Sequence, residues 1–388
     1  MRVAMSIAPR TARDAWPSYA ALAAIGYVIY GVGAVAPYLR AQLGLSDAEV
    51  GLHSTAIAVG VVATGVVTPA LARHFGEIVA RGTALAGLAI AVGALAVAPA
   101  LAVTLVAGGL VGFGTGTMLG YANAILVRPG GRLARLRVAR ANMWAMVAAF
   151  VGPLAVATAV TNQLPWGLGL VPAFGLLVIV AFDIRAGTRF DPTAEVVEVR
   201  RRLPSGYWLS WAFLVAAVAI EFSIVFWGET LIQRRTGVET ATATALGGLF
   251  LGGMFTGRLV QSLGLGTGGD IRRPAAAGAV LAITGASIAW ISTASAFSAA
   301  GLFVAGLGVA GLYPLGVAAA LATTPDQPAL AATRLTLASG LAVLVAPLAL
   351  GVAADVLGVV VGWGLVLGFG LVALVLAATL PGGMPDEA

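Results

Sequence analysis

The sequence predicts an all-α polytopic membrane protein, with twelve transmembrane helices in two six-helix bundles related by pseudo-two-fold symmetry. The 388-residue chain is 60% hydrophobic and only 10% charged, and its mean hydropathy is +0.98. Soluble domains carry about 25% charged residues. Twelve apolar runs are long enough to cross a bilayer, and an internal repeat divides them into two sets of six.

The apolar runs follow one another with short polar connections. Because a helix satisfies its own backbone hydrogen bonds in lipid, we expect each run to be a spanning helix. Glycine steps such as Gly248-xxx-Gly252 and Gly253-xxx-Gly257 predict close packing between these helices. The expected spans are 17–39, 50–71, 80–98, 100–127, 141–161, 165–183, 207–229, 241–261, 274–292, 296–321, 334–354 and 357–380.

Arginines predict the orientation of the helices. With a cytoplasmic N-terminus, the outer segments hold only Arg40, Arg234 and Arg235, and all other arginines fall on the cytoplasmic side. We therefore expect an integral protein of a bacterial inner membrane with both termini in the cytoplasm. Tryptophans near the predicted span ends indicate an aromatic belt, formed by Trp16, Trp166, Trp208, Trp211, Trp227, Trp290 and Trp363.

The composition argues against several other functions. The chain has no cysteine and two histidines, so thiolate metal sites and cysteine nucleophiles are excluded and a histidine metal cluster is improbable. The glycine-rich segment 264–270 lacks the lysine and the serine or threonine of a phosphate-binding loop. We expect no catalytic residues, no metal and no cofactor. The basic residues are scattered through short loops, which does not suggest nucleic-acid binding.

The two halves of the chain share their spacing. Arg140 and Pro153 in the fifth span are separated by the same distance as Arg334 and Pro347 in the eleventh. Parallel repeats about an axis along the membrane normal place a binding site between the halves, near the midplane. The expected domains are an N-terminal bundle at 1–183, a cytoplasmic linker at 184–206 and a C-terminal bundle at 207–388.

This organisation resembles the major facilitator superfamily over nearly the whole chain. In the loop after the second span, Arg73, Gly76 and Arg81 look like the basic and glycine positions of its signature, although Ala72 stands where that signature has an acid. Gly152-Pro153 resembles the core of its antiporter signature. The resemblance implies a monomeric secondary transporter, and the antiporter-like motif favours export of the solute over uptake. The expected gating residues are Arg73, Gly76, Arg81, Arg140 and Arg334.

The predicted span 207–229 contains an acid near its middle, Glu221. A charge at that depth costs roughly 2–3 kcal/mol, so it needs a partner, a proton or a water-filled cavity. One interpretation is a carboxyl that couples proton movement to substrate movement. The alternative is a structural carboxyl satisfied by hydroxyls or amides of a neighbouring helix.

In the family that the chain resembles, spans one, four, seven and ten line a central cavity. The substrate-binding candidates on those spans are Tyr27, Tyr30, Tyr121, Asn123, Glu221, Phe222, Phe226 and Tyr313. We expect no arginine deep within a span, and this predicts a small neutral, zwitterionic or cationic organic solute rather than a multivalent anion. His53 and Asp355 lie near outer span ends, where we expect them to be solvated.

The function therefore expected is proton-coupled secondary transport of a small molecule. Its expected partners are the solute, the proton as coupling ion and membrane lipids. Two alternatives on the same scaffold stay open, a flippase for lipid-like amphiphiles and proton-symport uptake of a metabolite. A membrane-embedded enzyme is a further alternative, but no cluster of acids or histidines in the sequence favours it.

Overall fold

In the computed structural model, the described residues are 16–127, 131–185, 203–262, 270–324 and 328–381. Within these ranges the regular secondary structure consists of helices joined by short connections. The elements are α1 Trp16–Leu43, α2 Asp47–Phe75, α3 Glu77–Val97, α4 Leu101–Val127, α5 Gly131–Thr161, the 3₁₀ helix η2 Trp166–Leu170, α6 Pro172–Arg185, α7 Ser205–Thr236, α8 Thr240–Gly247, α9 Leu249–Ser262, α10 Arg272–Ile291, α11 Ser295–Val309, α12 Leu312–Ala322, α13 Pro328–Leu357, α14 Val359–Gly362 and α15 Gly364–Thr379.

The prediction of an all-α polytopic membrane fold is confirmed. In the described part of the chain, eleven helical segments are long and apolar enough to cross a membrane. The remaining predicted span, 165–183, is formed by η2 and α6, whose apolar helix Trp166–Phe182 is shorter than the others. Three of the spans are interrupted, between α8 and α9, between α11 and α12, and between α14 and α15.

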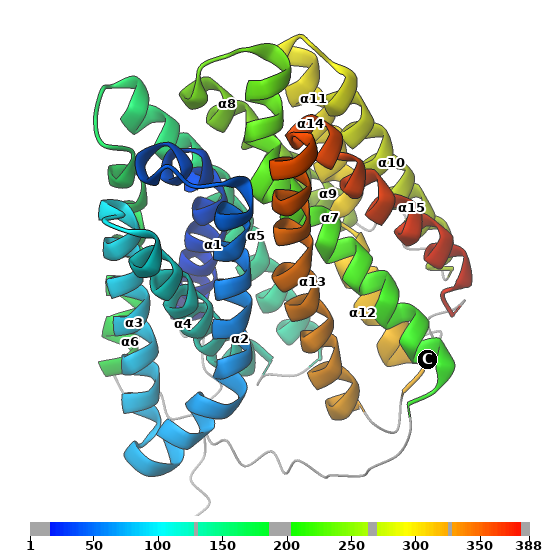
Figure 1. The fold of residues 1–388 in the computed structure, drawn as a ribbon. Coiled ribbons are helices and arrows are strands. Elements are labelled where there is room, and N and C mark those ends of the chain that lie inside the picture. Colours follow the sequence, from blue (N-terminus) through cyan, green and yellow to red (C-terminus); the bar gives the residue numbers. More distant parts are fainter. Residues whose placement is uncertain (1–15, 128–130, 186–202, 263–269, 325–327, 382–388) are drawn as a thin grey trace, which may run out of the picture.

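The helices α1 to α6 form one side of the molecule, and the helices α7 to α15 form the other side (Figure 1). Several contacts join the two sides: α2 packs on α13, α5 packs on α8 and α9, and α1 packs on α7 and α8. The second span of each half thus meets the fifth span of the other, as parallel repeats require. The expected linker at 184–206 lies largely outside the described residues, so the domain boundaries stay a prediction.

Close helix packing at the glycine steps is confirmed. A side-chain carbon added at Gly253 in α9 would meet the backbone of Phe303 in α11, and one at Gly257 would meet Leu307 and Ala310. Small residues let backbones approach to this distance, which maximises dispersion contacts where lipid offers no hydrophobic driving force.

The seventh span is longer than predicted. The helix α7 continues past residue 229 to Thr236 and ends at Gly237, whose φ of 71° is a left-handed conformation that glycine adopts without strain. Arg234 and Arg235 therefore belong to the last turn of α7 rather than to a loop. Arg235 donates a hydrogen bond of 2.7 Å to the carbonyl of Ile291 at the end of α10.

Two expectations about polar and aromatic residues at span ends are wrong. Trp227 and Trp363 are only 1% and 0% exposed, and they donate to the carbonyls of Pro347 and Ala286 instead of marking the membrane surface. His53 is also buried, and its Nε2 lies 2.9 Å from the hydroxyl of Thr104 in α4. Each side chain is satisfied by a neighbouring helix, so water is not needed.

Candidate functional site

The crossing of α1 and α7 places an acid and a phenol together. At the crossing, a side-chain carbon added at Gly33 would meet the backbone carbonyl of Val225. Tyr30 lies about one turn before Gly33, and Glu221 lies about one turn before Val225. The close approach thus brings Tyr30 and Glu221 to the same level between the two sides of the molecule.

The hydroxyl of Tyr30 donates a 2.5 Å hydrogen bond to Oε1 of Glu221. Both residues are buried, and Glu221 is 6% exposed. The ring of Tyr30 also stacks on Phe222, with centroids 6.4 Å apart and planes at 24°. Glu221 therefore lies where α1 and α7 meet, not against lipid, and it has a partner from the other half of the chain.

A cation and a second phenol act on this acid. Arg258 in α9 interacts electrostatically with Glu221, with Tyr30 and with Tyr313 in α12. Tyr313 is 39% exposed, and Ser339 of α13 and Arg258 both act on its phenol. Arg258 lies near the end of the candidate span Thr240–Gln261, so it does not contradict the expectation that no arginine lies deep within a span. Its position near the end of an apolar run predicts a cytoplasmic arginine, and the sequence does not show that it acts on Glu221.

The other predicted binding residues do not share one site with Glu221. The hydroxyl of Tyr27 donates a 2.5 Å bond to the carbonyl of Gly169, so Tyr27 anchors η2 rather than meeting Glu221. Phe226 is buried in α7, and Asn123 is half-buried in α4. Tyr121 lies in a pocket of the first half, described next.

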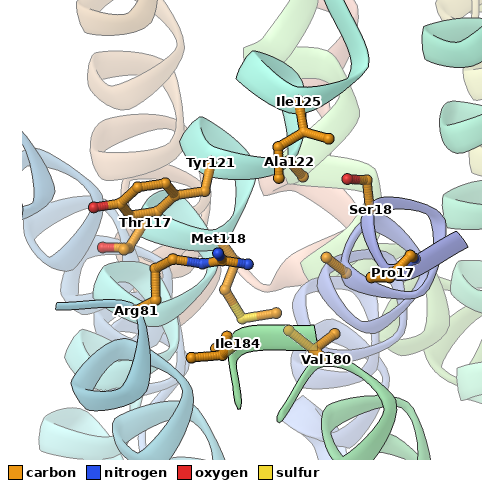
Figure 2. Close-up of a pocket in the computed structure, with 11 residues that line it drawn as sticks. Pro17, Ser18, Arg81, Thr117, Met118, Tyr121, Ala122, Ile125, Val180 and Ile184 are labelled. Atoms are coloured by element: carbon orange, nitrogen blue, oxygen red, sulfur yellow. The ribbon is translucent and has the colours of Figure 1, made fainter. Parts of the chain in front are cut away.

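That pocket lies among α1, α3, α4 and α6 and has about 350 Å³ of empty space. Figure 2 shows the side chain of Arg81 extending toward Met118, with the ring of Tyr121 beside it. The guanidinium carbon of Arg81 is 5.4 Å from the centroid of that ring, a cation–π distance. This pocket is thus separate from the Glu221 site, and it brings a predicted gating residue to a predicted substrate residue.

The remaining gating candidates lie at helix ends or near them. Arg73 is exposed in the last turn of α2, and Gly76 joins α2 to α3 with a φ of 87°. Arg140 is exposed where the apolar part of α5 begins. Arg334 is exposed in α13, and its guanidinium carbon lies 5.7 Å from the ring centroid of Trp208 in α7. Its described ring contact is thus within the second half, not with an acid of the first.

The two halves are held together at the end of the molecule where α2 begins. Asp355 of α13 accepts hydrogen bonds of 2.6 and 2.8 Å from the backbone N–H groups of Asp47 and Ala48. Further along α2, the hydroxyl of Thr55 donates to the carbonyl of Leu344 at 2.8 Å. Asp355 was expected to be solvated, and it is exposed, but it also caps a helix of the other half.

The far half of α2 is not covered in the same way. Val66 is 75% exposed and Phe75 is 66% exposed, whereas Gly51 packs on Pro347 and Leu348. The contact between α2 and α13 is therefore concentrated at the end that carries Asp47 and Asp355.

Solved structures of transporters share this architecture. A bacterial homologue of the human lysosomal transporter Spinster, solved in an inward-facing and occupied conformation, has a TM-score of 0.74 at 14% identity, over 96% of this chain and 97% of that chain. A mutant of the peptide transporter POT has a TM-score of 0.73 at 18% identity, over 95% and 94%. A mutant of the nucleoside transporter NupG has a TM-score of 0.71 at 12% identity, over 94% and 99%.

Neither a protein-family model nor a curated protein sequence matches the chain. At these low identities the structural likeness shows the fold alone. The chain is an integral membrane protein with the major facilitator fold.

Proposed function

We propose that this protein is a secondary active transporter that moves a small organic solute by alternating access, with Glu221 as the proton-coupling residue. The proposal rests mainly on the 2.5 Å hydrogen bond between Tyr30 of α1 and Glu221 of α7. It joins a buried carboxyl of one half to a hydroxyl of the other. A relative movement of the halves breaks this bond, and the change in partner alters how readily the carboxyl holds a proton.

The contacts between the halves support alternating access. The α2–α13 contact is concentrated at the end with Asp47 and Asp355. If both termini are cytoplasmic, as the arginines predict, that end faces away from the cytoplasm and the protein is closed there. This arrangement agrees with the inward-facing conformation of the Spinster homologue.

The charges around Glu221 favour a zwitterionic solute among the neutral, zwitterionic and cationic classes. Arg258 provides a positive group that acts on Glu221, and Tyr30 and Tyr313 provide hydroxyls nearby. A solute with one ammonium and one carboxylate can pair with both charges. The resemblance of Gly152-Pro153 to an antiporter signature favours export over uptake.

The test begins with purified protein and a panel of neutral, zwitterionic, cationic and dicarboxylate solutes. A solute that binds the folded protein raises its unfolding temperature. Solutes that do so are then assayed in proteoliposomes, by counterflow and by transport under an imposed pH gradient. We expect counterflow to persist in Glu221→Gln while the pH gradient no longer drives accumulation.

The matched control is Glu239→Gln, which removes an exposed carboxyl just before α8. It should respond to the pH gradient as the wild type does. A full response by Glu221→Gln would contradict the proton-coupling role. Movement of a fluorescent lipid analogue without counterflow of any panel solute would favour the flippase alternative.

A further inference from the structure

The helix α7 carries a second buried acid, Glu229, which is 6% exposed. It lies eight residues after Glu221, which corresponds to about 12 Å along a helix. The sequence singles out Glu221 near the middle of the predicted span 207–229, and Glu229 stands at the end of that span. Because α7 continues to Thr236, Glu229 lies within the helix.

Hydroxyl groups surround this second acid. The hydroxyl of Thr244 in α8 donates a 3.0 Å hydrogen bond to Oε2 of Glu229. The hydroxyl of Tyr38 in α1 lies 3.2 Å from the same threonine oxygen. A threonine hydroxyl has one hydrogen, which here goes to Glu229, so Tyr38 is the donor to Thr244. The three groups form a directed chain from α1 through α8 to α7.

The backbone of α8 is built to approach Glu229 closely. A side-chain carbon added at Gly247 would overlap the Cγ atom of Glu229. Any larger residue at this position would displace the carboxyl or the helix. The close approach holds Glu229 among neighbouring helices and away from lipid, where a carboxyl would be costly.

A small pocket lies between Glu229 and Tyr30, the hydrogen-bond partner of Glu221. Glu229 and Tyr30 both line it, together with Pro153, Ile224, Gly248 and Leu251. Tyr30 is the residue whose hydroxyl donates to Glu221. A pocket with polar groups on both sides is a place where water can bridge them.

The charged groups around the two acids differ. Arg258 acts on Glu221, whereas α1, α8, α5 and α9 present to Glu229 the hydroxyls of Tyr38 and Thr244, the phenol of Tyr30 and apolar side chains. Farther toward the end of α7, Arg40 pairs with Asp47 at 2.9 Å, and Arg234 and Asp355 also act on Asp47. The two arginines offset the two acids, which lie at the end of the molecule where α2 begins, away from Glu229.

We propose that Glu229 is a second proton-binding carboxyl, and that it exchanges protons with Glu221 through water in the pocket and the hydroxyl of Tyr30. The inference rests on the proposed role of Glu221. In one transfer, the Tyr30 O–H bond breaks as an O–H bond forms on Glu221. Tyr30 regains a proton from water, and the water takes one from Glu229. One proton moves, and no group is oxidised or reduced.

Infrared spectroscopy of purified protein in nanodiscs tests this directly, because protonated carboxyls have a distinct C=O stretching band. The spectra are recorded across a pH titration for the wild type and for Glu229→Gln, Glu221→Gln, Thr244→Val and Tyr30→Phe. We expect Glu229→Gln to lose one carboxylic-acid band and to shift the titration of the Glu221 band. Thr244→Val keeps the carboxyl, loses its hydrogen bond and should shift the frequency of the Glu229 band.

Tyr30→Phe should leave both bands but make their titrations independent. Glu239→Gln removes an exposed carboxyl and should change neither band. Two results would overturn the inference: a Glu229→Gln spectrum identical to the wild type at every pH, or a Glu221 titration that is the same with and without Glu229. The readout does not require transport, so a failure of the transport assay leaves this test intact.

Discussion

Asp355 at the end of α13 caps the first turn of α2 by accepting hydrogen bonds from the backbone N–H groups of Asp47 and Ala48. The helix α2 already has its own cap, because Ser46 and Glu49 form a reciprocal capping box. The second cap comes from a residue about three hundred positions away in sequence, in the other half of the chain. It therefore stabilises the contact between the halves as well as the helix.

Removing this cap should favour opening of the molecule at that end. Loss of an N-terminal cap costs about 1 kcal/mol. We therefore expect Asp355→Ala to lower the population of the state closed at this end and to raise that of the open state. The chain has no cysteine, so spin labels can be attached to Ala41→Cys and Val356→Cys alone. Double electron–electron resonance should show a larger long-distance fraction in Asp355→Ala. An unchanged distance distribution would contradict the role of this cap.

Tyr30→Phe should affect both stability and proton coupling. The substitution keeps the ring that stacks on Phe222 and removes the hydroxyl that donates to Glu221. A hydrogen bond to a charged or buried group contributes about 1–3 kcal/mol, so the unfolding temperature should fall. In proteoliposomes, the response to a pH gradient should fall as well.

Tyr27→Phe is the matched control for this experiment. It removes a hydroxyl one turn away on the same helix, which donates to the carbonyl of Gly169 and not to an acid. We expect a similar loss of thermal stability with an unchanged response to the pH gradient. Equal transport phenotypes in the two variants would show that the Tyr30 hydroxyl acts only in packing.

Arg258→Gln should change which solutes bind. The substitution removes the positive charge that acts on Glu221, Tyr30 and Tyr313 and leaves a shorter, uncharged polar side chain. In the thermal-shift panel, the stabilisation by zwitterions should decrease relative to the stabilisation by cations. Arg235→Gln serves as a control, because that arginine caps α10 near the end of the molecule. A zwitterion preference that survives Arg258→Gln would exclude this arginine from binding.

Gly253→Ala should destabilise the protein through overpacking. The new methyl group would meet the backbone of Phe303, which cannot move without shifting α11. Overpacking of this kind costs roughly 1–3 kcal/mol, and it should appear as a lower unfolding temperature in detergent. Gly65→Ala in α2 is the control, because nothing lies within 4 Å of its added carbon. Equal unfolding temperatures for the two variants would show that the α9–α11 contact yields at little cost.

The sequence by itself determined the class of fold. Long apolar runs in a lipid environment leave the helix as the element that satisfies its own backbone, so composition and run length predict the spans. The cost of a charge in lipid also identified Glu221, because an acid in the middle of a long apolar run needs a partner. The matched positions of Pro153 and Pro347 predicted the duplication that places the seam between the halves.

The tertiary structure decided which side chains share an environment. Tyr27 and Tyr30 are three residues apart, but one meets η2 and the other meets α7. Glu229 and Arg258 stand near the ends of apolar runs, where sequence alone does not separate a buried group from a solvated one. Their partners come from helices distant in sequence, and the crossing of those helices is set by backbone contacts at positions such as Gly33 and Gly247. Hydropathy reports how apolar a segment is, but the pairing of its few polar groups depends on which helix faces it.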